Sequence, residues 1–163
     1  MLLTTPSLQC LDEGGKMVEP ATLFSLAGTL ALLGWVALLV ALFFRRARPG
    51  VWSVTQYVIP GLIAVAYGLL WWGGRGAYAD GGFGSIPEVR VWFANDYLLT
   101  AGWLHYLAFD LFIGTWICRD AETRRIHPLL VLPTLPLTFL FGPLGLLLWF
   151  VVRAVVRVTG SKE

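Results

Sequence analysis

The segment NDYLLTAGWLHYLAFDLFIGTWICRD, residues 95–120, decides the fold that this sequence predicts. It is long and apolar enough for a helix across the hydrocarbon core of a membrane, which needs about 20 residues. Yet it carries His105 and Asp110 near its middle, where a charged group costs roughly 3 kcal/mol to insert. Ionisable groups at this depth normally face the protein interior, so the segment predicts both a membrane span and a polar site.

The composition of the whole chain also indicates an integral membrane protein. Of its 163 residues, 57% are hydrophobic and only 13% are charged, which is about half the charged fraction of a soluble domain. This length suits one domain over residues 1–163. The arginines form no long basic run, so nucleic-acid binding is not expected. Cys10 and Cys118 are predicted on opposite sides of the membrane, and we expect no disulfide between them.

Four apolar segments each have nearly the length of a membrane span. Their approximate bounds are 21–44, 54–72, 97–118 and 129–152. The predicted fold is therefore all-α, an integral membrane bundle of four transmembrane helices. Several prolines interrupt the fourth segment, and each removes a helix hydrogen bond. We expect the fourth helix to be kinked or broken, and the kinked form is favoured.

The links between the spans predict the orientation of the chain. Residues 45–53 and 119–128 are short and rich in arginine, so the positive-inside rule places them in the cytoplasm. The acidic N-terminus, which resembles neither a signal peptide nor a transit peptide, is then outside. The glycine-rich link that follows the second span is also outside, and its end, residues 87–96, is expected to form a short interfacial helix. With four full crossings the basic C-terminal tail falls outside as well, which conflicts with the same rule.

His105 and Asp110 are predicted to lie on different faces of the third span. At about 100° per residue they are roughly 140° apart, so the helix alone cannot direct them to one ion. They could still line one wide cavity from two sides. Asp96, Trp103 and Asp110 share a stripe, because residues seven apart nearly superimpose on a helix. Tyr106, one turn before Asp110, is the expected hydrogen-bond partner of its carboxyl group.

Several other side chains are candidates for binding or supporting roles. Most lie on the third span beside His105 or Asp110, where aromatic rings could form a wall for an apolar ligand. One lies at the start of the fourth span. The supporting candidates are Asn95, Asp96, Trp103, Tyr106, Phe109, Phe112 and His127.

Metal binding is a weaker interpretation of the same region. His105, Asp110, Asp120 and His127 have side chains that can ligate a metal, but their spacing matches no recognised motif. Asp120 has a plainer explanation as a loop acid paired with Arg124, and His127 as a residue at a helix start. No cofactor is therefore predicted, and a metal stays a minor alternative.

Catalysis by the third span would involve proton transfer. Burial disfavours the charged forms of a carboxyl group and of an imidazole, which makes a proton donor and a proton acceptor available near neutral pH. The sequence has no nucleophile elbow, phosphate-binding loop, haem motif or dinucleotide fingerprint. Redox chemistry with a tightly bound cofactor is therefore disfavoured.

Residues 93–153 resemble the ABA4-like membrane proteins, which are named for a plant chloroplast protein required to form neoxanthin from violaxanthin. The resemblance rests on HYLAFDLFIG with a following Trp, on RDA, on IHP and on TFLFGPLGLLL. It implies a four-helix membrane protein that handles an epoxy-carotenoid or a related isoprenoid. The chain looks bacterial in size, so the expected location is a bacterial inner membrane.

The leading hypothesis is an isomerase-like membrane enzyme that acts on a carotenoid or related isoprenoid. Opening an epoxide to an allene needs an acid at oxygen and a base at carbon, for which we assign Asp110 and His105. One alternative is a non-catalytic membrane binder of a lipid or isoprenoid pigment. The other is a small transporter or channel formed by homo-oligomers, with the stripe of Asp96, Trp103, Tyr106 and Asp110 facing water. Membrane lipid and an apolar isoprenoid-type ligand are the expected partners.

Overall fold

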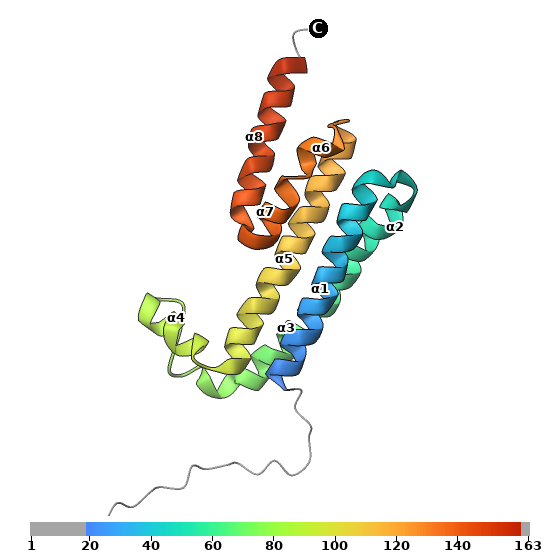
Figure 1. Cartoon of the computed structure of the whole chain (residues 1–163). Coiled ribbons are helices and arrows are strands. Elements are labelled where there is room, and N and C mark those ends of the chain that lie inside the picture. The colour runs from blue at the N-terminus through green and yellow to red at the C-terminus, as the bar shows by residue number, and fades with distance from the viewer. Residues whose placement is uncertain (1–18, 161–163) are drawn as a thin grey trace, which may run out of the picture.

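The computed structural model describes residues 19–160, and within them it contains helices and short links without any strand (Figure 1). The prediction of an all-α fold is confirmed. Helix α1 covers Pro20–Phe43 and helix α5 covers Asp96–Thr123. Between them lie η1 (Arg45–Ala47), α2 (Arg48–Ser53), the π-helical η2 (Val54–Val58), α3 (Ile59–Gly73), η3 (Gly74–Ala77) and α4 (Ile86–Phe93). After α5 come α6 (Pro128–Val131), α7 (Thr134–Phe141) and α8 (Pro143–Gly160).

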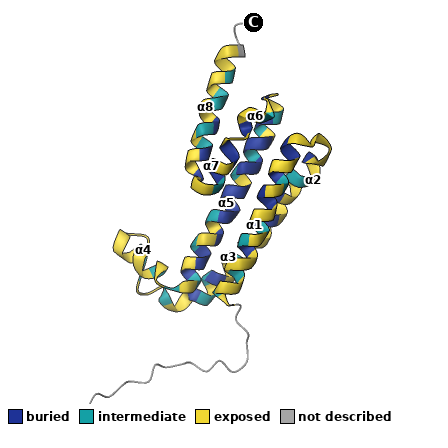
Figure 2. Ribbon diagram, viewed as in Figure 1, coloured by how far each residue is buried: buried dark blue, intermediate teal, exposed yellow. Residues whose placement is uncertain are grey.

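Three helical stretches are long and apolar enough to cross a membrane, namely Pro20–Phe43, Arg45–Ala77 and Asp96–Thr123. They correspond to the first three predicted spans and are compatible with an integral membrane protein. The second begins earlier than predicted, because residues 45–53 continue into α3 as helical turns instead of forming a loop. Figure 2 shows buried residues where α1, α3 and α5 face one another and exposed residues on their outer sides.

Small residues allow the three long helices to approach closely. A Cβ atom at Gly34 of α1 would lie 2.8 Å from the Leu111 side chain of α5. A Cβ atom at Gly114 would lie 2.5 Å from the indole ring of Trp35. Such small-residue contacts are common between membrane helices, where close van der Waals packing drives association. A buried hydrogen bond from the Thr115 hydroxyl to the Thr55 hydroxyl, 2.9 Å long, also joins α5 to η2.

The glycine-rich link after the second span ends in the expected short helix, α4. Ser85 begins it as a capping residue: its side chain accepts from the Glu88 N–H and donates to the Glu88 carboxylate at 2.9 Å. Trp92 of this helix packs edge-on against Trp71, at 5.4 Å between ring centroids. A Cβ atom at Gly81 would lie 2.2 Å from the Trp92 ring, so the link is packed against aromatic side chains.

The fourth predicted span is broken, and the favoured kinked helix is not found. It divides into α6, α7 and α8, of which Pro128–Phe141 is a shorter apolar helical segment. The chain reverses at Gly142, where φ is +28°, a value that favours glycine, and Pro143 then starts a new helix. The first turn of α8 packs closely on α7, because a Cβ atom at Gly145 would lie only 2.3 Å from the Thr138 backbone nitrogen.

Helix α8 therefore runs back beside α7, and residues 128–160 form a helical hairpin (Figure 1). Its C-terminal end lies at the same end of the molecule as α6 and the link between α1 and α2. We call this the arginine-rich end. Its arginines are Arg45, Arg46, Arg48, Arg119, Arg124, Arg125, Arg153 and Arg157. The hairpin removes the conflict created by four full crossings, since the elements that carry these arginines meet at one end of the molecule. Cys10, Lys162 and the acidic residues before Glu19 lie outside the described residues.

The hairpin predicts on which side of the membrane α8 ends. In a Cys10→Ser background, Arg46→Cys and Thr159→Cys should react with a membrane-impermeant maleimide from the same side of sealed vesicles. Asp80→Cys, in the link at the other end, should react only from the opposite side. Labelling of Thr159→Cys from the side that labels Asp80→Cys would contradict the hairpin.

Candidate functional site

Asp110 lies in the middle of α5 and faces the bend of the helical hairpin. Its side chain is buried, with the residue only 9% exposed. A Cβ atom at Gly142 would lie 2.5 Å from Asp110 Oδ1, so the carboxyl group occupies the space that any larger residue at the bend would need. The start of α8 follows directly, and a helix N-terminus carries partial positive charge. The carboxyl group and the bend thus form one polar site within an apolar bundle.

One oxygen of Asp110 is enclosed without a hydrogen bond. Among the described residues, Oδ2 has no hydrogen-bond partner. Tyr106, the predicted partner, lies beside the carboxyl group and donates its hydroxyl to the backbone oxygen of Phe139 in α7 at 2.9 Å. This bond satisfies a carbonyl group near the bend, where irregular backbone at membrane depth needs partners from the protein. The Asp110 carboxyl group therefore keeps a free oxygen for proton transfer.

His105 is on a different face of α5, as the helical angles predict. Its side chain is exposed on the outer surface. The imidazole stacks on Phe109, with ring centroids 4.5 Å apart, and lies 6.2 Å from the ring of Tyr67 on α3. The structure therefore does not bring His105 and Asp110 together. His105 belongs to an aromatic cluster with Tyr67 and Phe109, which would face lipid.

Two of the supporting candidates cap helices. The Asn95 side chain begins α5 by accepting from the N–H groups of Tyr97 and Leu98, at 3.0 and 3.3 Å. His127 begins α6 in the same way, since its Nδ1 accepts from the Leu129 N–H at 3.3 Å. These contacts give both residues a structural role, which the helix-start interpretation of His127 predicted.

The remaining supporting candidates are spread along α5. Asp96 is exposed in the first turn of the helix. Trp103 stacks between Phe24 and Tyr106, at 5.5 and 5.4 Å between ring centroids. Phe112 is 37% exposed and, like Trp103, would contact lipid more than the carboxyl group. None of them contacts Asp110 Oδ2 through a hydrogen bond in the described part of the chain.

Asp120 holds α8 against α5. It pairs with Arg124, as expected, with both carboxylate oxygens 3.0 Å from the guanidinium Nε. It also accepts from Trp149 Nε1 at 3.1 Å and forms an ion pair with Arg153 at 3.3 Å. The side chain is therefore fully used in structural contacts. Within residues 19–160, no three His, Cys, Asp or Glu side chains gather as a metal site would require.

Sequence reasoning pointed to the fourth segment, through His127, but missed which of its residues reach the acids of α5. Gly142, Trp149 and Arg153 all contact acids of α5, yet no spacing within the sequence relates them to that helix. The one available signal was the Gly142–Pro143 pair, because glycine followed by proline is typical of a helix end. It indicated where the chain turns, although not what the turn would touch.

The architecture defines a class: an all-helical membrane bundle in which a buried carboxyl group meets the bend of a helical hairpin. The family described as ABA DEFICIENT 4-like, or ABA4-like, matches residues 22–149. That match covers most of the chain and includes α5 and the bend, so the protein belongs to the ABA4-like family. No curated protein and no solved structure matches the chain.

The contact between Asp110 and Gly142 can be tested with a double-mutant cycle. Gly142→Ala should lower the free energy of unfolding by about 1–3 kcal/mol, through a steric clash and an unfavourable φ. In an Asp110→Ala background the steric part is absent, so the same change should cost clearly less. Thermal unfolding in detergent measures the destabilisation by Gly142→Ala in the wild-type and in the Asp110→Ala background. Gly68→Ala is the control, because a Cβ atom at that position meets nothing within 4 Å. Equal costs in the two backgrounds would show that the residues do not touch.

Proposed function

We propose that the protein is an integral membrane enzyme of the isomerase type, which acts on a carotenoid or related isoprenoid by acid/base chemistry. The observation that carries the proposal is the buried Asp110 carboxyl group, whose Oδ2 lacks a hydrogen-bond partner among the described residues. A polar group this costly to bury in a membrane span is normally functional. Membership of the ABA4-like family, which takes its name from a plant protein required to form neoxanthin, supports the substrate class.

The proposed reaction moves protons and needs no oxidant. Asp110 donates its proton to the epoxide oxygen as the carbon–oxygen bond opens, which leaves a hydroxyl group. A base then removes a proton from the neighbouring carbon, and the electrons of that carbon–hydrogen bond form the new double bond. The product is an isomer of the substrate, because every atom is retained.

Two groups can serve as the base. His105 is the group that the sequence suggests, and it requires a substrate that reaches the outer face of α5. The Asp110 carboxylate is the other, since after giving up its proton it can take one back from carbon. The second version uses one site and fits the separation of the two side chains. The effect of replacing His105 distinguishes them.

A pigment or lipid binder is the second candidate function, favoured by the cluster of His105, Phe109 and Tyr67 on the outer face of α3 and α5. An extended isoprenoid could lie against these rings. The channel alternative has less support, because its stripe requires Asp110 at a water-lined surface. Asp110 is instead buried under the bend at Gly142.

Turnover of violaxanthin by purified protein in lipid nanodiscs tests the proposal, with products separated by chromatography. Asp110→Asn, which removes the proton donor with little change in shape, should lower turnover by about 100-fold or more. Asp80→Asn, an exposed acid at the other end of the molecule, is the matched control and should leave turnover unchanged. His105→Gln should lower turnover only if the imidazole is the base.

Full turnover by a folded Asp110→Asn variant would refute the role of Asp110. Recovery of an unaltered carotenoid bound in stoichiometric amount, without conversion, would favour the binder instead.

A further inference from the structure

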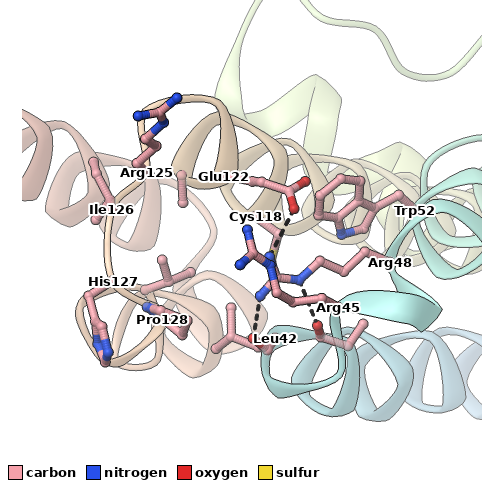
Figure 3. Close-up of a pocket in the computed structure, with 13 residues that line it drawn as sticks. Leu42, Arg45, Arg48, Trp52, Cys118, Glu122, Arg125, Ile126, His127 and Pro128 are labelled. Carbon is pink, nitrogen blue, oxygen red and sulfur yellow. Dashed lines mark hydrogen bonds and ion pairs between the residues drawn. The ribbon is translucent and has the colours of Figure 1, made fainter.

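A cavity of about 400 Å³ opens at the arginine-rich end, and neither Asp110 nor Gly142 lines it (Figure 3). Arg45 lines it from the link between α1 and α2, and Arg48 and Trp52 line it from α2. Arg125 and His127 line it from the link between α5 and α6 on the opposite side. This volume falls in the range of small-molecule sites. Because the cavity shares no lining residue with the Asp110 site, a ligand bound in it would be independent of the proposed function.

Arg48 holds the two walls of the cavity together through hydrogen bonds. Its guanidinium group donates to the backbone oxygens of Ala41 and Leu42 at the end of α1, at 3.0 and 2.7 Å. It also donates to the Glu122 carboxylate of α5 at 2.9 Å. These three bonds satisfy carbonyl groups at a helix end and join α1 to α5. The charge of Arg48 is thereby balanced by Glu122.

The other cations of the cavity are not balanced in this way. The side chains of Arg45 and Arg125 have no hydrogen-bond or ion-pair partner among residues 19–160. In Figure 3, Arg45 from the α1–α2 link and Arg48 from the start of α2 both extend toward the α5–α6 link. His127 uses Nδ1 to cap α6, which leaves Nε2 as a hydrogen-bond donor. The cavity therefore has more positive than negative charge.

Arg125 occupies a backbone position that normally requires glycine. Its φ is +56°, and among the described residues it is the only residue other than glycine with a positive φ. The N–H of Ile126 donates to Ala121 O and that of Arg125 to Glu122 O, at 2.9 and 3.0 Å. This pattern is a Schellman motif, whose left-handed residue is usually glycine. An arginine here is unfavourable for the backbone, which suggests that the side chain has a use at the cavity.

We propose that this cavity binds a phosphate-bearing group, either the head group of an anionic lipid or a free phosphate or diphosphate. The guanidinium fork matches phosphate oxygens in geometry and charge, so two unpaired arginines favour this chemistry. Basic pockets between membrane helices near the cytoplasmic surface suit phosphorylated head groups. Apolar walls at Leu42, Trp52 and Val131 can accept carbon atoms attached to the phosphate.

The test compares two double variants that remove the same number of positive charges from the same two links. Arg45→Gln with Arg125→Gly removes the unpaired cations of the cavity, and the new glycine suits the left-handed position. Arg46→Gln with Arg124→Gln is the matched control, since neither residue lines the cavity. Melting temperatures of all proteins are measured first, and the cavity variant should melt no more than a few degrees below the wild type.

Binding is measured on full-length protein in phosphatidylcholine nanodiscs. In one experiment pyrophosphate is titrated into the buffer. In the other the fraction of phosphatidic acid in the nanodisc is increased. Native mass spectrometry detects the bound ligand in both. The wild type should bind at least one probe, the cavity variant at least tenfold more weakly, and the control variant within threefold of the wild type. Binding of phosphatidic acid alone identifies a lipid, and binding of pyrophosphate identifies a soluble ligand. Failure of both probes, or equal weakening in the two variants, would overturn the proposal.

Discussion

The contact between Asp110 and the bend at Gly142 is the constraint on which the rest of the structure depends. A bend in a membrane exposes backbone groups that lipid cannot satisfy, so it persists only where the protein covers it. Here α5 covers it, and Asp110 Oδ1 leaves no space for a side chain at Gly142. The carboxyl group in turn is shielded from lipid by the bend. Each of the two costly features is therefore stabilised by the other.

The side on which the chain ends follows from that bend. Because α8 runs back beside α7, Arg153 reaches Asp120 at the arginine-rich end, and Trp149 donates to the same carboxylate. Asp110 and Asp120 of α5 thus differ in their contacts: Asp120 is bonded by Arg124, Arg153 and Trp149 and holds α8 against α5, while Asp110 keeps an unbonded oxygen. The proposed chemistry therefore rests on Asp110, and the basic cavity at the arginine-rich end has none of its lining residues in common with that site.

Local sequence patterns were enough to predict the long helices and the faces of α5. Apolar length located the three long helices, and the angle between successive helical residues was enough to separate His105 from Asp110. It could not predict the break at Gly142, because prolines alone do not distinguish a kink from a reversal. Tyr106 lies beside Asp110, as predicted, but its hydroxyl donates to Phe139 O, since the position of α7 is set by packing between distant segments. The cavity was missed for the same reason: Arg45 and Arg125 meet only in the folded chain.

The most direct test of the hairpin is a distance between spin labels at Leu130 and Val155, both exposed, measured by double electron–electron resonance in nanodiscs. A helix that continued across the membrane would separate these positions by about 38 Å, at 1.5 Å per residue. The helical hairpin returns Val155 toward the level of Leu130 and predicts a distance distribution centred below about 25 Å, since packed helices lie roughly 10 Å apart. A single distribution centred near the longer value would contradict the bend, and with it the site at Asp110.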